Sequence, residues 1–224
     1  MSQYSRIEVC LKIKEAGLVP IHFNKDAETV KNVAKACYDG GARIFEFTNR
    51  GDFAHEVFTE LSKYVIKNLP GMILGVGSIE DAATSALYIQ SGANFIVSPI
   101  LTPEMAKVCN RRKIAWIPGC GTLTEIAYAE ELGAEIVKTF PAMQIGGPDF
   151  IKNIKGPRPW TNIMSTGGVM PTEENLKAWF QAGTYCVGMG SKLITKKLIA
   201  SGDWAGISAN VNKVLEIIQS IRLA

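Results

Sequence analysis

Histidine is scarce in this chain, which limits the metal sites that it can build. The 224 residues include only His22 and His55, and these two are not spaced like the ligands of a zinc centre. The sequence therefore predicts no bound metal. We interpret His22, in an apolar run, as a hydrogen-bonded residue of the core or of a pocket, and His55 as a solvated residue of a helix.

Paired cysteines and long apolar segments are also missing. The five cysteines lie far apart, with no CxxC pair and no compact disulfide framework, a pattern typical of a reducing cytoplasm. The first residues do not form the apolar segment of a secretory signal, and no run of about 18 apolar residues follows. We therefore expect a soluble, cytoplasmic protein with no membrane partner.

A large excess of either charge is absent as well. Lys and Arg number 24 against 21 Asp and Glu, and the net charge of +3 is too small to indicate a nucleic-acid or membrane partner. Two glycine-rich stretches, 75–77 and 188–192, lack the spacing of a dinucleotide-binding turn and of a nucleotide P-loop. The four tryptophans are scattered and form no stacking platform for bases. We expect no cofactor and no nucleic acid.

Short apolar or β-branched runs are present in a regular series, and each is followed by a turn and a segment with helical spacing. This alternation predicts a parallel sheet, and eight such units predict a closed (β/α)8 TIM barrel, a fold that often reaches this length as one domain. We expect one barrel domain over residues 1–224, with an extra N-terminal helix within 1–17. The eight predicted strands are 18–23, 42–48, 72–76, 94–98, 114–117, 135–140, 162–165 and 185–187.

Two charged residues fall inside these predicted strands. Alternate residues of a barrel strand face the interior, and because Phe45 and Phe47 favour the helix-facing side, Glu46 is left facing inward. Both faces of strand 135–140 are partly apolar, so the pattern does not decide where Lys138 points. If Lys138 points inward, it and Glu46 come from even-numbered strands, whose side chains share layers, and the amine and the carboxyl group converge.

Lys138 is the most informative single residue. A lysine in a low dielectric loses its proton more easily, and its neutral amine can attack a carbonyl carbon to form a Schiff base while a nearby carboxylate moves protons. Two structural interpretations compete with this chemistry. Lys138 could extend from an edge strand into water, or it could form a buried ion pair with Glu46 that has no catalytic role.

Further candidates follow the strands at the end of the barrel where active sites lie. Arg50 could hold a substrate carboxylate through its planar fork, although a surface loop arginine is equally compatible with the sequence. Small residues follow strands seven and eight, at Ser165-Thr166-Gly167-Gly168 and Gly188-Met189-Gly190-Ser191. Backbone N–H groups in these two loops frequently bind phosphate in this fold, so we expect a phosphate site there.

Short motifs along nearly the whole chain resemble the family of 2-keto-3-deoxy-6-phosphogluconate (KDPG) and 4-hydroxy-2-oxoglutarate aldolases. Each motif is weak alone, and together they are specific. They are Phe45-Glu46-Phe47-Thr48-Asn49-Arg50, Gly75-Val76-Gly77-Ser78-Ile79, Phe95-Ile96-Val97-Ser98-Pro99, Ile117-Pro118-Gly119, Val137-Lys138-Thr139-Phe140-Pro141-Ala142, Thr166-Gly167-Gly168 and Gly188-Met189-Gly190-Ser191.

The resemblance implies a class I aldolase, typically a homotrimer, that works without a metal. It implies that Lys138 is the Schiff-base lysine and that Glu46 is the general acid and base. It further implies that Arg50 holds the carboxylate of pyruvate, together with Ser78, which stands where the family often has threonine. The other substrate-binding residues that it implies are Pro99, Phe140, Thr166, Gly167, Gly168, Gly190 and Ser191.

The leading reaction under this resemblance is reversible cleavage of KDPG to pyruvate and glyceraldehyde 3-phosphate, so the expected partner is a small phosphorylated 2-keto acid. The same chemistry on 4-hydroxy-2-oxoglutarate, or on the galacto epimer of KDPG, is the nearest alternative. A phosphate-sugar isomerase or epimerase would use the barrel without a covalent lysine. A non-catalytic binding protein would keep the pocket without turnover.

Overall fold

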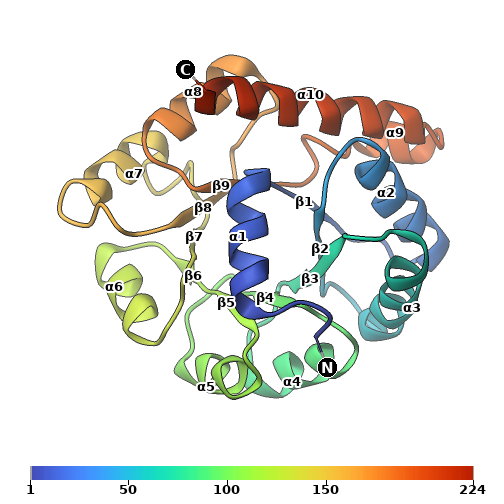
Figure 1. The fold of residues 1–224 in the computed structure, drawn as a ribbon, viewed down its shortest axis with the longest axis horizontal. Helices are drawn as coiled ribbons and strands as arrows, with labels where there is room; N and C mark the ends of the chain where they lie inside the picture. Colours follow the sequence, from blue (N-terminus) through green and yellow to red (C-terminus); the bar gives the residue numbers. More distant parts are fainter. Residues whose placement is uncertain (1, 224) are drawn as a thin grey trace.

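The computed structural model describes residues 2–223, which form a barrel of parallel strands inside a ring of helices (Figure 1). The strands are β1 (Leu18–His22), β2 (Ile44–Thr48), β3 (Ile73–Gly77), β4 (Phe95–Val97), β5 (Ala115–Ile117), β6 (Gly119–Cys120), β7 (Val137–Thr139), β8 (Ile163–Thr166) and β9 (Cys186–Met189). The helices are α1 (Arg6–Ala16), α2 (Ala27–Asp39), α3 (Ala54–Asn68), α4 (Ala82–Gln90), α5 (Pro103–Arg112), α6 (Leu123–Glu131), α7 (Gly147–Lys155), α8 (Glu173–Gln181), α9 (Lys196–Ala200) and α10 (Trp204–Leu223).

The strand order confirms the predicted barrel. The nine strands form one sheet in the order β5-β4-β3-β2-β1-β9-β8-β7-β6, so that its two edges, β5 and β6, are consecutive in the chain. Only Pro118 separates them. The fifth predicted strand is therefore present in two pieces, and the barrel is closed through its backbone.

The break at Pro118 follows from the chemistry of proline, which has no backbone N–H to donate to a neighbouring strand. On one side of the break, the Ile117 carbonyl accepts a hydrogen bond of 3.1 Å from the Ser98 N–H. On the other side, the Pro118 carbonyl accepts one of 2.8 Å from the Lys138 N–H. The chain thus changes neighbours within two residues, from β4 to β7.

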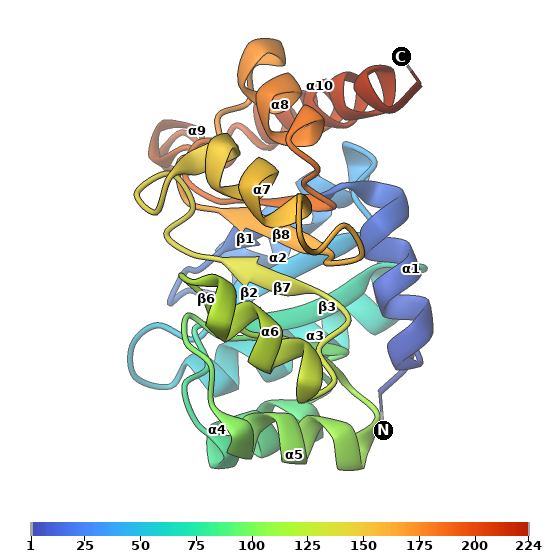
Figure 2. The ribbon, with the colours of Figure 1, turned by 90° about the vertical axis from the view of Figure 1, so that its left-hand side faces the viewer.

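Helix α1 is the extra N-terminal helix that the sequence predicted, and it covers the amino-terminal end of the barrel (Figures 1 and 2). Ser5 caps it, since the Ser5 hydroxyl accepts from the Glu8 N–H while the Glu8 carboxylate accepts from the Ser5 N–H. Val9 and Ile13 are fully buried and belong to the cluster of side chains that fills the barrel. The interior is therefore closed at one end and accessible only from the other.

Two apolar layers hold the fold together. The inner layer consists of inward-facing strand residues such as Ile44, Phe95 and Met164, together with the buried side chains of α1, Val9 and Ile13. The outer layer lies between the strands and the surrounding helices and includes Phe45 and Phe47, which face outward as their alternation predicted. Glu46, between these two phenylalanines, must then face the interior.

Candidate active site

A cavity of about 810 Å³ opens at the carboxyl ends of the strands, opposite α1. This is the end at which barrels of this class bind substrates. The structure brings together, around this one cavity, all of the residues that sequence reasoning selected: Glu46, Arg50, Ser78, Pro99, Lys138, Phe140, Thr166, Gly167, Gly168, Gly190 and Ser191.

Lys138 and Glu46 form the buried part of the cavity lining. Lys138 lies in the middle of β7 and is only 6% exposed, and Glu46 lies in β2 and is 1% exposed. The sequence left open where Lys138 points, and the structure shows that its side chain points into the barrel. Lys138 does not extend into water, and its strand is not at an edge of the sheet. The two groups reach the same cavity from strands on opposite sides of β1.

Burial shifts the pKa values of both groups toward their neutral forms. Loss of hydration lowers the pKa of Lys138, and the positive charge of Arg50 lowers it further, while the Glu46 carboxylate opposes the shift. Burial raises the pKa of Glu46, against the influence of the positive charges on Lys138 and Arg50. Both shifts suit an amine that attacks as a free base and a carboxyl group that both donates and accepts protons.

Lys138 and Glu46 face the same space without touching. Within the described residues they form no salt bridge at 4.0 Å or less. The Glu46 Oε2 atom is buried and has no hydrogen-bond partner among residues 2–223. A plain structural ion pair would have consumed these atoms, whereas this arrangement keeps a carboxyl oxygen available for a molecule between them.

Gly77 sets the position of the Glu46 carboxyl group, and sequence reasoning gave this glycine no role. A Cβ atom at residue 77 would overlap Oε1 of Glu46, so any larger residue would displace the carboxyl group. A glycine inside a predicted strand is a signal that another group approaches closely. The predicted strand 72–76 ended one residue before Gly77, so this signal was missed, whereas β3 extends to Gly77 in the structure.

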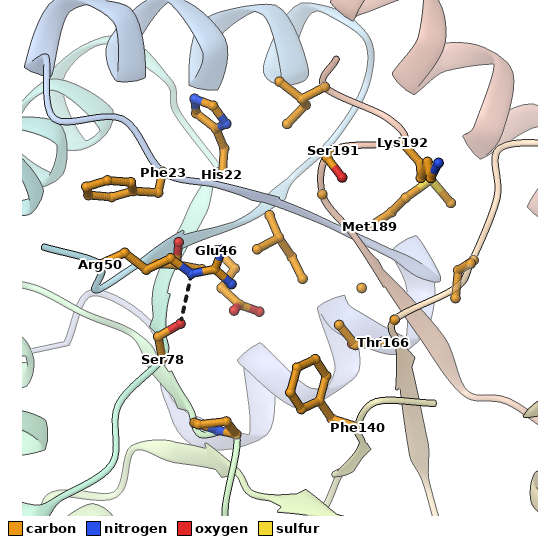
Figure 3. A pocket seen from close by; sticks show the side chains of 18 of the residues that line it. His22, Phe23, Glu46, Arg50, Ser78, Phe140, Thr166, Met189, Ser191 and Lys192 are labelled. Carbon is orange, nitrogen blue, oxygen red and sulfur yellow. Dashed lines mark hydrogen bonds between the residues drawn. The ribbon is translucent and has the colours of Figure 1, made fainter. Parts of the chain in front are cut away.

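Arg50 and Ser78 lie together at one side of the cavity (Figure 3). The Arg50 Nε atom donates to the Ser78 hydroxyl over 3.5 Å, which is a long hydrogen bond. Ser78 has a φ of 59°, an uncommon conformation for a residue with a side chain. The other N–H groups of the Arg50 fork have no hydrogen-bond partner among the described residues and are free for a carboxylate.

Phe140 lies against the amine of Lys138. The Lys138 Nζ atom lies 4.8 Å from the centre of the Phe140 ring, and this ring is 37% exposed at the cavity surface. Phe140 lies one residue beyond β7, where the predicted strand 135–140 was too long. The ring limits the access of water to Lys138 and gives the cavity an apolar wall.

Two glycine loops form the wall that follows β8 and β9. Gly167 and Gly168 have φ values of 98° and 88°, which side chains rarely adopt, and a Cβ atom on Gly168 would overlap the side chain of Met143. Thr166 is 8% exposed, and its hydroxyl has no partner among the described residues. The small residues leave the backbone of this wall open to the cavity.

His22 also lines the cavity, so of the two positions expected for it, core or pocket, it occupies the pocket. The hydrogen bond that we expected is missing at one of its nitrogens. Its Nε2 atom is buried without a hydrogen-bond partner among residues 2–223, and burial lowers the pKa of its imidazole to about 4. Figure 3 shows its ring pointing away from Glu46. Alternation explains this, since Ile21 occupies the inward position.

Sequence reasoning missed several other lining residues, because nothing in their local pattern indicates chemistry. Asn24 and Glu80 belong to loops that follow β1 and β3. Lys192 and Lys196 follow β9 and extend the cavity beyond the second glycine loop.

The described part of the chain offers no set of ligands for a metal ion, since no three His, Cys, Asp or Glu side chains gather in one place. None of the helices described here has the length and apolar character needed to cross a membrane.

Known proteins resemble this chain over most of its length. A family model described as KDPG and KHG aldolase matches residues 9–210. A 2-dehydro-3-deoxy-phosphogluconate aldolase of Haemophilus influenzae is 30% identical over 216 residues, which cover 96% of this chain and 99% of that protein. A protein of the same name from Pseudoalteromonas atlantica is 33% identical over 194 residues, 87% of each chain.

The fold has a counterpart among solved structures as well. The crystal structure of the 2-keto-3-deoxy-6-phosphogluconate aldolase of Zymomonas mobilis with 3-phosphoglycerate has a TM-score of 0.78 and 27% identity to this chain. The match covers 93% of this chain and 94% of that chain. With a family model that spans most of the chain and relatives of nearly equal length, this protein belongs to the KDPG and KHG aldolase family.

Proposed function

We propose that this chain is a class I aldolase that reversibly cleaves 2-dehydro-3-deoxy-6-phosphogluconate (KDPG) to pyruvate and glyceraldehyde 3-phosphate. The observation that carries the proposal is the burial of Lys138 and Glu46 on the lining of one cavity, with no ion pair between them among the described residues. The relatives from Haemophilus influenzae and Pseudoalteromonas atlantica are named as aldolases of this substrate.

Lys138 begins the reaction as a neutral amine, because its burial favours loss of the proton. Its Nζ atom adds to the keto carbon C2 of the substrate to form a carbinolamine. The neutral carboxyl group of Glu46, whose pKa is raised by burial, donates the proton with which the carbinolamine hydroxyl leaves as water, and a protonated imine remains. Arg50 and Ser78 hold the neighbouring carboxylate and thereby orient C2 toward the amine.

Glu46 moves the protons of the cleavage step. Its carboxylate takes the proton of the C4 hydroxyl, directly or through a water, and the electrons of the C3–C4 bond move into the imine to form an enamine. Glyceraldehyde 3-phosphate leaves as the aldehyde. Glu46 then returns the proton to C3, and hydrolysis of the imine releases pyruvate and restores the Lys138 amine.

The two glycine loops hold the phosphate of the aldehyde half in this proposal. Thr166, Gly167 and Gly168 on one loop, and Gly190 with Ser191 on the other, border the cavity away from Arg50. Accessible N–H groups and hydroxyls at such loops bind phosphate oxygens. Pro99 and Phe140 provide the apolar walls between the two ends.

Steady-state cleavage of KDPG, followed by the release of pyruvate, tests this function. Wild-type protein is expected to turn over, and Lys138→Ala is expected to show no detectable cleavage because no other amine replaces the nucleophile. Lys155→Met is the matched control: Lys155 is a second lysine whose pKa is lowered by burial, but it lies outside the cavity and donates to the Thr161 carbonyl at 2.5 Å.

Wild-type cleavage that persists in Lys138→Ala would contradict the proposal. The same assay with 4-hydroxy-2-oxoglutarate and with the galacto epimer ranks the alternatives that share this chemistry. If kcat/KM is higher for one of these two compounds than for KDPG, that compound is the preferred substrate, and the role of Lys138 is unchanged.

We also propose that the chain acts in the cytoplasm as a homotrimer, with residues 1–224 as a single aldolase domain. The family resemblance supports the trimer. The five cysteines support the compartment, because all are free and four are buried, and a protein of an oxidising compartment commonly pairs its cysteines.

A further inference from the structure

The cavity extends past the two glycine loops and changes its charge there. Among the described lining residues the carboxylates are Glu46 and Glu80, which belong to β2 and to the loop after β3. Beyond the second glycine loop the charged lining residues are Lys192 and Lys196. Figure 3 shows Ser191 and Lys192 across the cavity from Arg50 and Ser78. The far end of the cavity is therefore cationic.

The backbone on both sides of Lys192 is held firmly. The Gly190 carbonyl accepts two hydrogen bonds of 2.9 Å, from the N–H groups of Leu193 and Ile194. Both of these side chains are buried, and the Asn210 amide donates to the Leu193 carbonyl at 3.2 Å. Lys192 thus projects from a fixed turn, so its side chain reaches the cavity without ordering a mobile loop.

The ammonium groups of Lys192 and Lys196 take part in no ion pair among the described residues. Within residues 2–223 neither lysine forms a salt bridge at 4.0 Å or less. Lys31, by contrast, is paired with Glu28 at 2.7 Å and with Glu60 at 3.1 Å. The two cavity lysines are available for an anion that enters the site.

Neutral hydrogen-bond donors alone do not balance the charge of a bound phosphate monoester. It carries about two negative charges near neutral pH, and the glycine loops provide only backbone N–H groups and hydroxyls. Ammonium groups are effective partners of phosphate because they supply full charge from a flexible stem. The glycine loops and the two lysines border the same end of the cavity.

We propose that Lys192 and Lys196 bind the terminal phosphate of the aldehyde half, so that this chain selects phosphorylated over unphosphorylated substrates by charge. This inference rests on the proposed aldolase function and names its specificity-determining residues. The glycine loops position the phosphate, and the two lysines neutralise it. A short dicarboxylate, whose second charge lies closer to the keto carbon, gains less from this end of the cavity.

The test compares kcat/KM for KDPG and for 2-keto-3-deoxygluconate, which lacks the phosphate, in wild-type protein and variants. Lys192→Met is expected to lower the preference for the phosphorylated substrate about tenfold, and Lys192→Met with Lys196→Met to lower it further. Lys192→Arg keeps the charge and is expected to retain most of the preference. Lys197→Met is the matched control, since this lysine is the next residue of α9 but does not line the cavity.

The dependence of the substrate preference on ionic strength is an independent test. If Lys192 and Lys196 had only a structural role, this dependence would not change in their variants. The wild-type preference is expected to fall as salt rises, and that of the double variant to respond less. A double variant with the wild-type preference and salt dependence would overturn the proposal while leaving the aldolase function intact. Wild-type protein that cleaves neither substrate would overturn both.

Discussion

The pKa values of Lys138 and Glu46, the two residues that we propose as catalytic, depend on burial more than on any direct contact. Lys138 and Glu46 each lose hydration inside the barrel, and each shifts toward its neutral form. The charges of Lys138 and Arg50 oppose the shift of Glu46, and the charge of Glu46 opposes the shift of Lys138, but the loss of hydration is larger in both cases. A pair of this kind can exchange protons with a substrate, whereas a tight ion pair would hold them.

The charge on Glu46 can be tested through the pKa of Lys138. Because the Glu46 carboxylate raises that pKa, Glu46→Gln is expected to lower it and to move the acid limb of pyruvate adduct formation to lower pH. Cleavage is expected to slow by about 10²–10⁴-fold, because the proton carrier is lost. Rates measured across a pH series check both effects.

Glu80→Gln is the control for this substitution. Glu80 lines the same cavity but does not contribute to the shift of the Lys138 pKa. For the Glu80→Gln variant, the acid limb of pyruvate adduct formation is expected to coincide with that of the wild-type protein. An acid limb that stays in place or rises in Glu46→Gln would contradict the assigned interaction.

Some residue orientations could be predicted from the sequence and others could not. Glu46 was predicted to face inward because two aromatic neighbours require the outer layer, and the structure confirms it. Lys138 was left open, because both faces of its strand are apolar and periodicity carries no further information. Lys192 gave no signal, since its position depends on how the chain turns after β9.

Helix α1 contributes at the scale of secondary structure, because it supplies side chains to a core that the strands alone cannot close. Ile13 is fully buried in the inner layer, while Ile7 on the same helix is 71% exposed. Ile13→Ala is therefore expected to lower the free energy of unfolding by about 2–5 kcal/mol. Ile7→Ala is expected to change it by less than about 0.5 kcal/mol.

Urea denaturation measures the free energy of unfolding of both variants. Because both substitutions change helix propensity equally, the difference between them reports the contribution of the buried Ile13 side chain. Equal effects would show that α1 does not stabilise the barrel through its buried face. The helix itself was predictable from its sequence, since Ser5 and Glu8 form a recognisable capping box.

Strand boundaries were less predictable than strand identity. All eight predicted runs form strands, but β7 is shorter than predicted and β9 extends to Met189. The ends depend on which neighbouring strand offers a partner, and a single segment does not contain that information. Proline gave a local signal at residue 118, because it cannot donate to a ladder, yet its effect on the fifth strand was not anticipated.

The whole molecule explains why residues distant in the sequence meet. Parallel strands in a closed barrel direct their carboxyl ends to one face, and the candidate residues follow strands from β2 to β9. The alternating sequence was therefore enough to predict the fold and the location of the site. Residue chemistry suggested roles for Lys138, Glu46, Arg50 and the two glycine loops. The substrate and the roles of Ser78, Pro99 and Phe140 came from the family resemblance, because composition and spacing do not define a substrate.

The most direct test of the central claim is borohydride reduction in the presence of pyruvate, followed by peptide mass spectrometry. The account predicts a stable pyruvate-derived group on Lys138, formed equally well in the presence of EDTA, and none on Lys155, whose pKa is also lowered by burial. Absence of an adduct, or an adduct on Lys155 in place of Lys138, would contradict it.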